Sequence, residues 1–376
     1  MNRAALLAGF ADRDPENPVL LCDLLDELLA AGRLDDAAAR LGKISTALRE
    51  TPSVRFREAR CTLLGGDTKT TIVLLQSLLG NMQTVPAGVV HDLAYAQFVE
   101  GRAEEALLTL AHAHASDGDA VALALLKARI LHRQKQLDAA LEALADVQSG
   151  ARLPEVQGLR ALLWLDIGDT ARASEQAELA LKADPDQHEA GLVRGTVALW
   201  SQQLQESVTA FERVLAKHPE SGRAWLGMGQ NVMLRGDVPA ARSMLERAST
   251  VMPDHIGTWH ALAWCQLLEG DLAGAKHSFD KAFVLDRTFG ETHGGFALVH
   301  ALRSERKEAE ESIKRAMRLD PQGRAARYAQ SVLLLDEGRV DEARKLVDSI
   351  VASTPAAGAV PADFIFRLRD LVRPRG

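Results

Sequence analysis

The side chains that could support catalysis or bind a metal are few and widely spaced. Cys22, Cys61 and Cys265 lie far apart and form no CxxC pair. This spacing argues against a disulfide framework or a cysteine-based zinc site, and it suits a reducing compartment. His293 and His300 fall at positions where bulky packing residues recur, so neither is expected to bind a metal. Because no Ser-His-Asp, Cys-His or paired-carboxylate arrangement stands out, we expect no catalytic residue, no metal and no cofactor.

Two glycine-containing stretches invite a nucleotide-binding interpretation. Residues 65–70, GGDTKT, faintly resemble a phosphate-binding loop, but Lys69 does not follow a glycine and no strand pattern precedes it. Gly227-Met228-Gly229 resembles half of a dinucleotide fingerprint, yet it lies inside a helical pattern where small residues serve helix contact. Both are interpreted as turn and packing residues.

The composition narrows the class of partner. Apolar residues make up 47% of the chain and aromatic residues only 5%, with Ala and Leu abundant, which favours helices over strands. A net charge of −7 offers no case for binding nucleic acid, which needs a basic patch or stripe. No apolar run approaches the roughly 20 residues of a membrane-spanning helix. Residues 4–11 could be read as a weak signal peptide, but acidic residues follow them, and a cytoplasmic protein is the preferred interpretation.

One small residue recurs along the chain at a nearly constant interval. The spacing is 34, 35, 34 and 33 residues and then 34 five times, along the series Ala37, Thr71, Ala106, Ala140, Ala173, Ser207, Ala241, Ala275, Ala309 and Ala343. Five positions before each member stand Gly32, Gly66, Gly101, Lys135, Gly168, Gln202, Gly236, Gly270, Ser304 and Gly338. A fixed period of this length is the signature of a repeat architecture.

Each repeat is predicted to form a helix, a tight turn and a second helix. Apolar residues recur at helical spacing on both sides of Gly236-Asp237, and the glycine is expected to adopt the left-handed conformation that ends the first helix. Prolines are expected to end second helices, at Pro185, Pro219, Pro253, Pro321 and Pro355. One hairpin cannot bury its apolar faces alone. The predicted fold is therefore all-α, a right-handed α-solenoid (superhelix) of stacked antiparallel helix hairpins.

The residues at these phases resemble the tetratricopeptide repeat (TPR) signature. One repeat matches it with Trp225, Met228, Gly229, Val232, Gly236, Ala241, Leu245, Ala248 and Pro253. About ten repeats are expected. The predicted division is an N-terminal capping helix (1–17), four divergent repeats (18–153), six near-consensus repeats (154–357), and a C-terminal capping helix and tail (358–376). The alternative for the C-terminal helix is a docking helix for a partner. Richness in Ala, Leu and Arg suggests a bacterial source.

The resemblance implies a concave groove lined by the first helix of each repeat, at its second, fifth, ninth and twelfth positions. The residues expected there to bind a partner are Phe56, Arg60, His91, Tyr95, Arg129, His132, Leu226, Gln230, His260, Trp264 and Tyr328. Fifth positions lack lysine and ninth positions lack asparagine, so the carboxylate clamp of chaperone-binding relatives is not expected. Several of the same side chains could instead pack between repeats.

The function implied by the resemblance is a non-catalytic scaffold or adaptor that binds a polypeptide segment of a partner protein. Exposed apolar and aromatic side chains favour a segment with apolar residues, and Arg60 and Arg129 would suit acidic groups on it. The alternative is a substrate-recruiting or regulatory subunit of a separate enzyme, such as a glycosyltransferase, a peptide-modifying enzyme or secretion or envelope-polymer machinery. A repeat protein with its own activity is the third interpretation, disfavoured because no non-repeat domain is evident.

Overall fold

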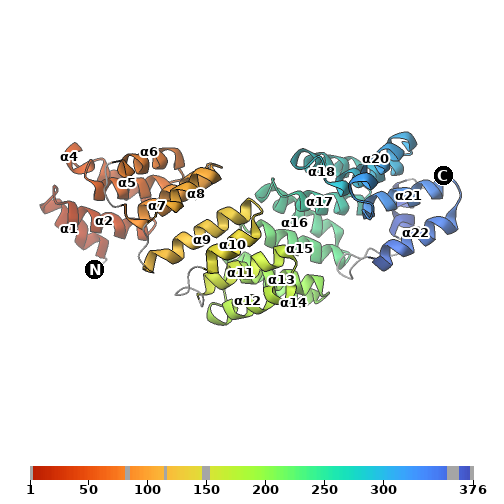
Figure 1. Ribbon diagram of the computed structural model, residues 1–376, viewed down its shortest axis with the longest axis horizontal. Coiled ribbons are helices and arrows are strands. Elements are labelled where there is room, and N and C mark those ends of the chain that lie inside the picture. The colour runs from red at the N-terminus through yellow and green to blue at the C-terminus, as the bar shows by residue number, and fades with distance from the viewer. Residues whose placement is uncertain (1–2, 81–84, 114–116, 146–152, 354–363, 373–376) are drawn as a thin grey trace. The chain divides into compact units, whose positions relative to one another are not determined.

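The computed structural model describes residues 3–80, 85–113, 117–145, 153–353 and 364–372. The chain divides into two compact units, residues 1–167 (unit 1) and 168–376 (unit 2). The regular structure of the described residues is α-helical, and hairpins follow one another along each unit (Figure 1). Among the described residues, no helix has the length and apolar character needed to cross a membrane.

The described helices are divided between the two units. Those of unit 1 are α1 (Arg3–Arg13), α2 (Pro18–Ala30), α3 (Leu34–Leu41), α4 (Thr46–Arg49), α5 (Pro52–Leu64), α6 (Thr68–Leu79), α7 (Ala87–Val99), α8 (Ala103–Ala111), α9 (Asp117–Arg133), α10 (Leu137–Ala145) and α11 (Pro154–Ile167). Those of unit 2 are α12 (Thr170–Ala183), α13 (His188–Trp200), α14 (Leu204–Lys217), α15 (Gly222–Leu234), α16 (Val238–Val251), α17 (Ile256–Leu268), α18 (Leu272–Leu285), α19 (Gly290–Leu302), α20 (Arg306–Leu319), α21 (Arg324–Asp336), α22 (Val340–Ser353) and α23 (Phe364–Val372).

Within each unit the first helices pack on one another and on the second helices. In unit 2, α15 contacts α16 in its own hairpin, α14 in the preceding one, and the first helices α13 and α17 on either side. In unit 1, α7 likewise contacts α8 in its own hairpin, α6 in the preceding one, and the first helices α5 and α9 on either side. Each unit is therefore an α-solenoid of stacked antiparallel helix hairpins.

The turns adopt the left-handed backbone conformation at every predicted phase. Positive φ angles of 69–97° occur at the seven predicted glycines. Lys135 (61°), Gln202 (59°) and Ser304 (64°) adopt the same conformation although they carry a Cβ. The turn geometry is thus a property of the hairpin rather than of glycine, and these three residues bear a steric cost that glycine avoids.

The residue after the turn glycine often starts the second helix. The Oδ1 atoms of Asp67, Asp169, Asp237 and Asp271 each accept a hydrogen bond from the backbone N–H three residues on, at 2.8–3.2 Å. These caps satisfy amides that a helix start leaves without partners. The phosphate-loop-like residues 65–70 form one of these turns, since Gly66 has φ 84° and Asp67 caps α6.

The aligned small residues lie where helices touch. All ten, from Ala37 to Ala343, are fully buried, as their phase predicts. The bulky residue four positions later fits into the next repeat: a Cβ on Gly227 would lie 2.2 Å from Cζ of Phe211, and one on Gly295 would lie 2.4 Å from Cε1 of Phe279. Gly227 therefore serves helix packing, as the sequence predicted.

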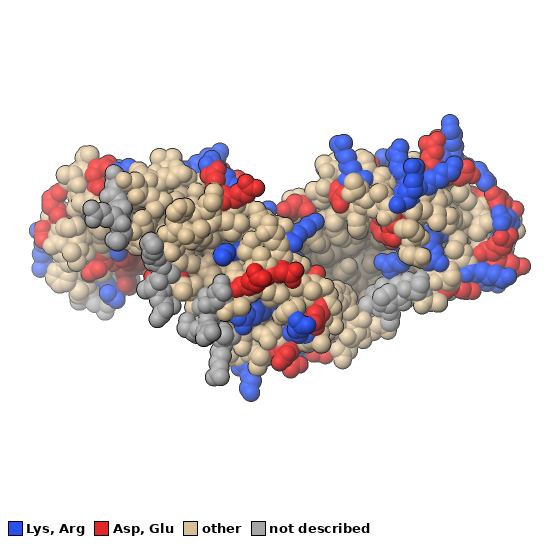
Figure 2. Space-filling view, in the orientation of Figure 1, with Lys and Arg blue, Asp and Glu red and all other residues tan. Residues whose placement is uncertain are grey.

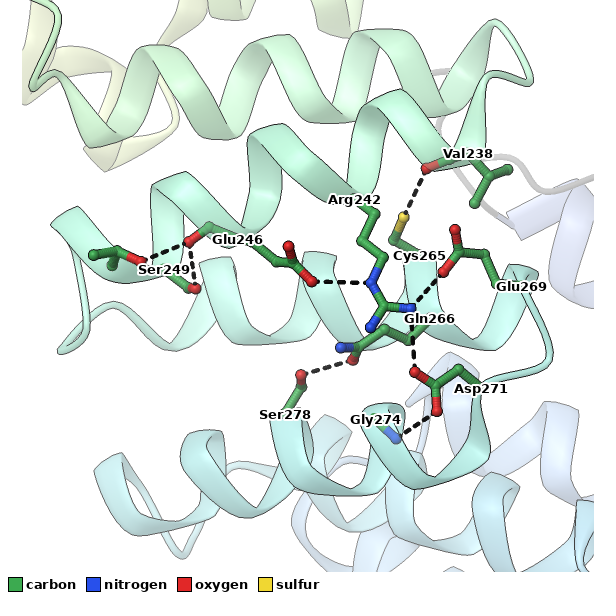
Figure 3. Close-up of polar contacts among 11 residues, drawn as sticks. Val238, Arg242, Glu246, Ser249, Cys265, Gln266, Glu269, Asp271, Gly274 and Ser278 are labelled. Carbon is green, nitrogen blue, oxygen red and sulfur yellow. Dashed lines mark hydrogen bonds and ion pairs between the residues drawn. The ribbon is translucent and has the colours of Figure 1, made fainter.

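Polar side chains tie successive repeats together (Figure 3). Arg242 on α16 pairs with Glu246 (2.9 Å) on its own helix, and with Glu269 (2.7 Å) and Asp271 (3.2 Å) at the next turn. The thiol of Cys265 on α17 lies 3.5 Å from the carbonyl of Val238 at the start of α16. Cys61 and Asn231 occupy the same phase and donate to the equivalent carbonyls of Leu34 and Leu204. Burial raises the pKa of Cys265 to about 12, so this thiol is a structural donor.

Second helices end at the predicted positions. Helices α12, α14, α16 and α20 each stop two residues before a proline, at Pro185, Pro219, Pro253 and Pro321. Helix α18 ends at the same phase without one, and Asp286 Oδ1 there accepts hydrogen bonds from the Thr288 amide and hydroxyl. Pro355 lies outside the described residues.

The ends of the array carry helices outside the hairpin pattern. Helix α1 packs on α2, where Ala4 and Ala11 are buried. Helix α23 packs on α21 and buries Ile365 and Leu368, and Arg369 pairs with Asp336 at 3.2 Å. The one-turn helix α4, capped by Ser45, has no counterpart among the elements predicted from sequence. Residues 354–363 and 373–376 of the predicted C-terminal segments are not described.

Candidate partner-binding surface

Four of the predicted residues in unit 2 line one hollow. Gln230 comes from α15, His260 and Trp264 from α17 and Tyr328 from α21, all first helices of hairpins. The hollow has a volume of about 350 Å³. Its lining consists of Leu199, Trp200, Gln230, Met233, Leu234, Gly257, His260, Ala261, Trp264, Leu268, Phe289, Glu291, Arg324 and Tyr328. In the space-filling view, unit 2 is hollowed and the inner surface is largely uncharged (Figure 2).

Aromatic side chains form the floor and rim of this hollow. Tyr328 is only 2% exposed, and its ring meets that of partly buried Trp264 edge to face at 5.9 Å, so Tyr328 is a floor residue. Trp200 at the end of α13 is 46% exposed and Phe289 just before α19 is 39% exposed. Sequence reasoning missed both, because they stand at a helix end and in a turn rather than at the implied groove positions.

His260 is held within the wall as an uncharged ring. Its Nε2 lies 2.8 Å from Oγ1 of Thr292, and its ring meets Phe279 at 5.4 Å and Phe289 at 5.2 Å edge to face. Burial lowers the pKa of His260 to about 4. At neutral pH this imidazole therefore adds a polar edge to the hollow but no charge.

Four predicted residues of unit 1 lie on α5 and α7. The Arg60 guanidinium lies 5.9 Å from the Phe56 ring centre, and its Nε lies 3.4 Å from Asp92. His91 Nδ1 lies 3.0 Å from the same carboxylate. The Arg60 charge is thus already partnered inside the chain, and a partner's carboxylate would compete with Asp92 for it. Tyr95 is 43% exposed.

The remaining predicted residues lie apart from these groups. Arg129 is exposed on α9, and His132 Nε2 lies 2.6 Å from Asp166 Oδ2 on α11. Leu226 packs against the core that contains Leu245. His132 therefore makes a polar contact between α9 and α11, and Leu226 packs on an apolar cluster, so both have contacts inside the chain.

The described residues contain no group of three or more His, Cys, Asp or Glu placed to hold a metal ion. All three cysteines are buried as free thiols.

Comparison with known proteins defines the class. Tetratricopeptide repeat family models match residues 198–262 and 297–358. No curated protein matches the chain. The crystal structure of the APC/C hetero-tetramer Cut9-Hcn1 is similar in fold, with a TM-score of 0.55 and 14% identity over 93% of this chain and 76% of that chain.

Two further structures are more distant. A tetratricopeptide repeat protein from Parabacteroides merdae has a TM-score of 0.44 and 20% identity over 65% of this chain and 98% of its own. MamA has a TM-score of 0.37 and 19% identity over 42% of this chain and 93% of its own. On its family matches and its helix hairpins, the chain is a tetratricopeptide repeat protein. Such repeats serve as protein-interaction scaffolds, and the chain is a scaffold of this class.

Proposed function

We propose that the chain is a non-catalytic adaptor whose first helices bind a polypeptide segment of a partner protein. The observation that carries this proposal is the hollow of unit 2, where Trp200 and Phe289 stay exposed beside Trp264. Exposed aromatic side chains around a concave apolar surface are typical of interaction sites, and tryptophan and tyrosine are frequent energetic anchors.

The test is affinity capture from the native host followed by mass spectrometry. Wild-type protein is compared with the double variant Trp264→Ala, Tyr95→Ala, which alters one groove position in each unit. Each true anchor contributes roughly 2 kcal/mol or more, so partners held by the groove should be lost from the variant. Far-ultraviolet circular dichroism should show the same helicity for both proteins.

A matched control uses exposed apolar residues on second helices. Leu108 on α8 and Val284 on α18 are both well exposed. The double variant Leu108→Ala, Val284→Ala should capture the wild-type set of partners. Equal capture by the groove variant and wild type would reject groove binding. Selective loss of a separate enzyme with the groove variant would favour the recruiting or regulatory subunit over a pure scaffold.

A further inference from the structure

The second helices of unit 2 carry a basic residue at one phase in four consecutive repeats. The row consists of Arg213 on α14, Arg247 on α16, Lys281 on α18 and Arg315 on α20, and all four are exposed. In the first two repeats the cation pairs with a carboxylate in the turn before the first helix of its own hairpin. Arg213 lies 2.7 Å from Asp186, and Arg247 lies 3.0 Å from Glu220.

The last two cations of the row have no such partner. In the repeat of Arg315, the position equivalent to Asp186 holds Thr288, so it offers no carboxylate. In the repeat of Lys281 the position holds Asp254, which forms no ion pair with Lys281. Among the described residues, no ion pair or hydrogen bond joins the side chain of Lys281 or Arg315 to another residue. These two charges are therefore open to an external partner.

Two more cations extend this surface along α20. Lys314 and Arg318 are exposed one turn apart on either side of Arg315 along the helix. Within the described part of the chain, Lys314 has no ion-pair partner, and the contact of Arg318 is a long one, 3.4 Å, to the carbonyl of Lys314. Helices α18 and α20 both pack on α19, so their equivalent positions lie on the same side of the array. We call Lys281, Lys314, Arg315 and Arg318 the basic ridge, and Figure 2 shows Lys and Arg gathered over α20.

The carboxylates near the basic ridge limit its length but do not neutralise it. Asp280 on α18 is occupied by Lys276 at 3.0 Å. Glu308 and Glu311 are exposed in the first half of α20, where the positive surface ends. A long polyanion such as nucleic acid would also meet these glutamates and be repelled by them. A short acidic segment is the better complement.

The spacing of the cations fits alternate residues of an extended chain. One helical turn separates Lys314 from Arg318, a rise of about 6 Å. Alternate residues of an extended polypeptide lie about 6.6 Å apart, with their side chains on the same side. We propose that the basic ridge binds an acidic segment of a partner polypeptide, in which Asp or Glu recurs at alternate positions. Because the ridge lies on second helices, it is a second binding surface, separate from the groove of first helices.

The test measures binding of a defined acidic peptide to the full-length protein. The probe is a Gly/Ser dodecapeptide with glutamates at alternate positions, compared with the same peptide carrying glutamines. Because exposed ion pairs are individually weak, we expect a Kd of about 0.1–1 mM at about 50 mM salt, measured by ligand-observed saturation-transfer NMR. About 300 mM salt should weaken this binding at least about threefold, because salt screens exposed charges. The glutamine peptide should not bind.

Neutralising the basic ridge should remove the binding. The double variant Lys281→Gln, Arg315→Gln should weaken it at least about threefold, and Gln at all four positions of the ridge at least about tenfold. The matched control is Arg213→Gln, Arg247→Gln, which removes two cations at the same phase that already have partners. The control should keep the Kd within about twofold of the wild type. Since all these side chains are exposed, circular dichroism should show unchanged helicity for every variant.

The outcomes distinguish this surface from the groove. The inference is overturned if the glutamate peptide binds no more tightly than the glutamine peptide, if its binding ignores salt, or if the two double variants behave alike. Tighter binding of a single-stranded dodecanucleotide to the basic ridge would assign the ridge to nucleic acid and also overturn the inference. Trp264→Ala should leave the Kd of the acidic peptide unchanged, so the adaptor function proposed for the groove is tested separately.

Discussion

His260 couples the stability of unit 2 to pH. The ordinary histidine pKa of 6.5 applies to the unfolded chain, and burial lowers the pKa of His260 to about 4 in the folded protein. Between these values the unfolded state binds a proton that the folded state does not. The stabilisation from a neutral His260 is therefore complete above pH 6.5, declines as the pH falls, and is lost by about pH 4.

Acid should destabilise the wild type more than a variant without this imidazole. The shift corresponds to at most about 3 kcal/mol of folding free energy. His260→Gln loses ring contacts with Phe279 and Phe289 at every pH, so the comparison is one of pH dependence. Urea unfolding near pH 7 and near pH 4.5 should show a smaller pH effect for the variant. Equal pH effects in both proteins would show that the lowered pKa of His260 is not the cause of the pH dependence.

The turns between paired helices set the next level of organisation. Seven carry glycine, but Ser304 holds φ at 64° between α19 and α20. A left-handed conformation costs an ordinary residue about 1–2 kcal/mol, and glycine avoids this cost. Because glycine also loses more backbone entropy on folding, the net gain from glycine is smaller than that cost. Ser304→Gly should therefore stabilise unit 2 by about 0.5–1 kcal/mol, measured as the urea midpoint. Gly270→Ala, at φ 79° in the neighbouring turn, should move the midpoint the other way.

Packing between repeats depends on matching a large side chain in one repeat to a small residue in the next. Phe211 on α14 fills the space that Gly227 on α15 leaves, whereas the next repeat pairs the smaller Leu245 with Ala261 at the same two phases. Gly227→Ala should destabilise by about 1–3 kcal/mol, because the new methyl overlaps the Phe211 ring. Adding Phe211→Leu copies the Leu245–Ala261 pair and should recover part of that loss in a double-mutant cycle.

Gly9 supplies the control for this cycle. It lies inside α1, and a Cβ added there would meet nothing within 4 Å, so Gly9→Ala should stabilise its helix by about 1 kcal/mol. If Gly227→Ala behaved like Gly9→Ala, the close approach to Phe211 would not be what holds glycine at that position.

The sequence predicted the helix hairpins more completely than it predicted the residues of the candidate partner-binding surface. A left-handed turn and a helix contact restrict residue type at one position in every repeat, so Gly236 and Ala241 identify them directly. The repeat positions of first helices also predicted which residues lie on one side of those helices, among them Gln230, His260, Trp264 and Tyr328. Where Trp200 and Phe289 lie depends on how a helix end and a turn of neighbouring repeats are placed in space, which the repeat period does not contain. The pairing of Arg60 with Asp92 joins α5 to α7, the first helices of two repeats, and it depends on residues that differ from one repeat to the next.

At the scale of the whole molecule, the core is local. Separate apolar clusters serve α1 to α5, α5 to α7 and α7 to α9 in unit 1, while a larger one extends from α17 to α23 in unit 2. Stability in such an array is a sum of hairpins and their interfaces. Removing a contact should therefore destabilise the adjacent hairpins first, and most readily the hairpins at an end of the array.

Helix α23 offers the sharpest test of this locality. Leu368 is buried against the last hairpin, so Leu368→Ala should remove about 2 kcal/mol or more there. Because each 1.4 kcal/mol is about tenfold in an equilibrium, amides of α21 and α22 should exchange hydrogen at least about tenfold faster. Amides of α15 and α16 should keep their rates, and Asp370→Ala, an exposed change on the same helix, should leave all of them unaltered. Faster exchange spread equally over unit 2 would mean that the unit unfolds as one cooperative body, and local summation would be wrong.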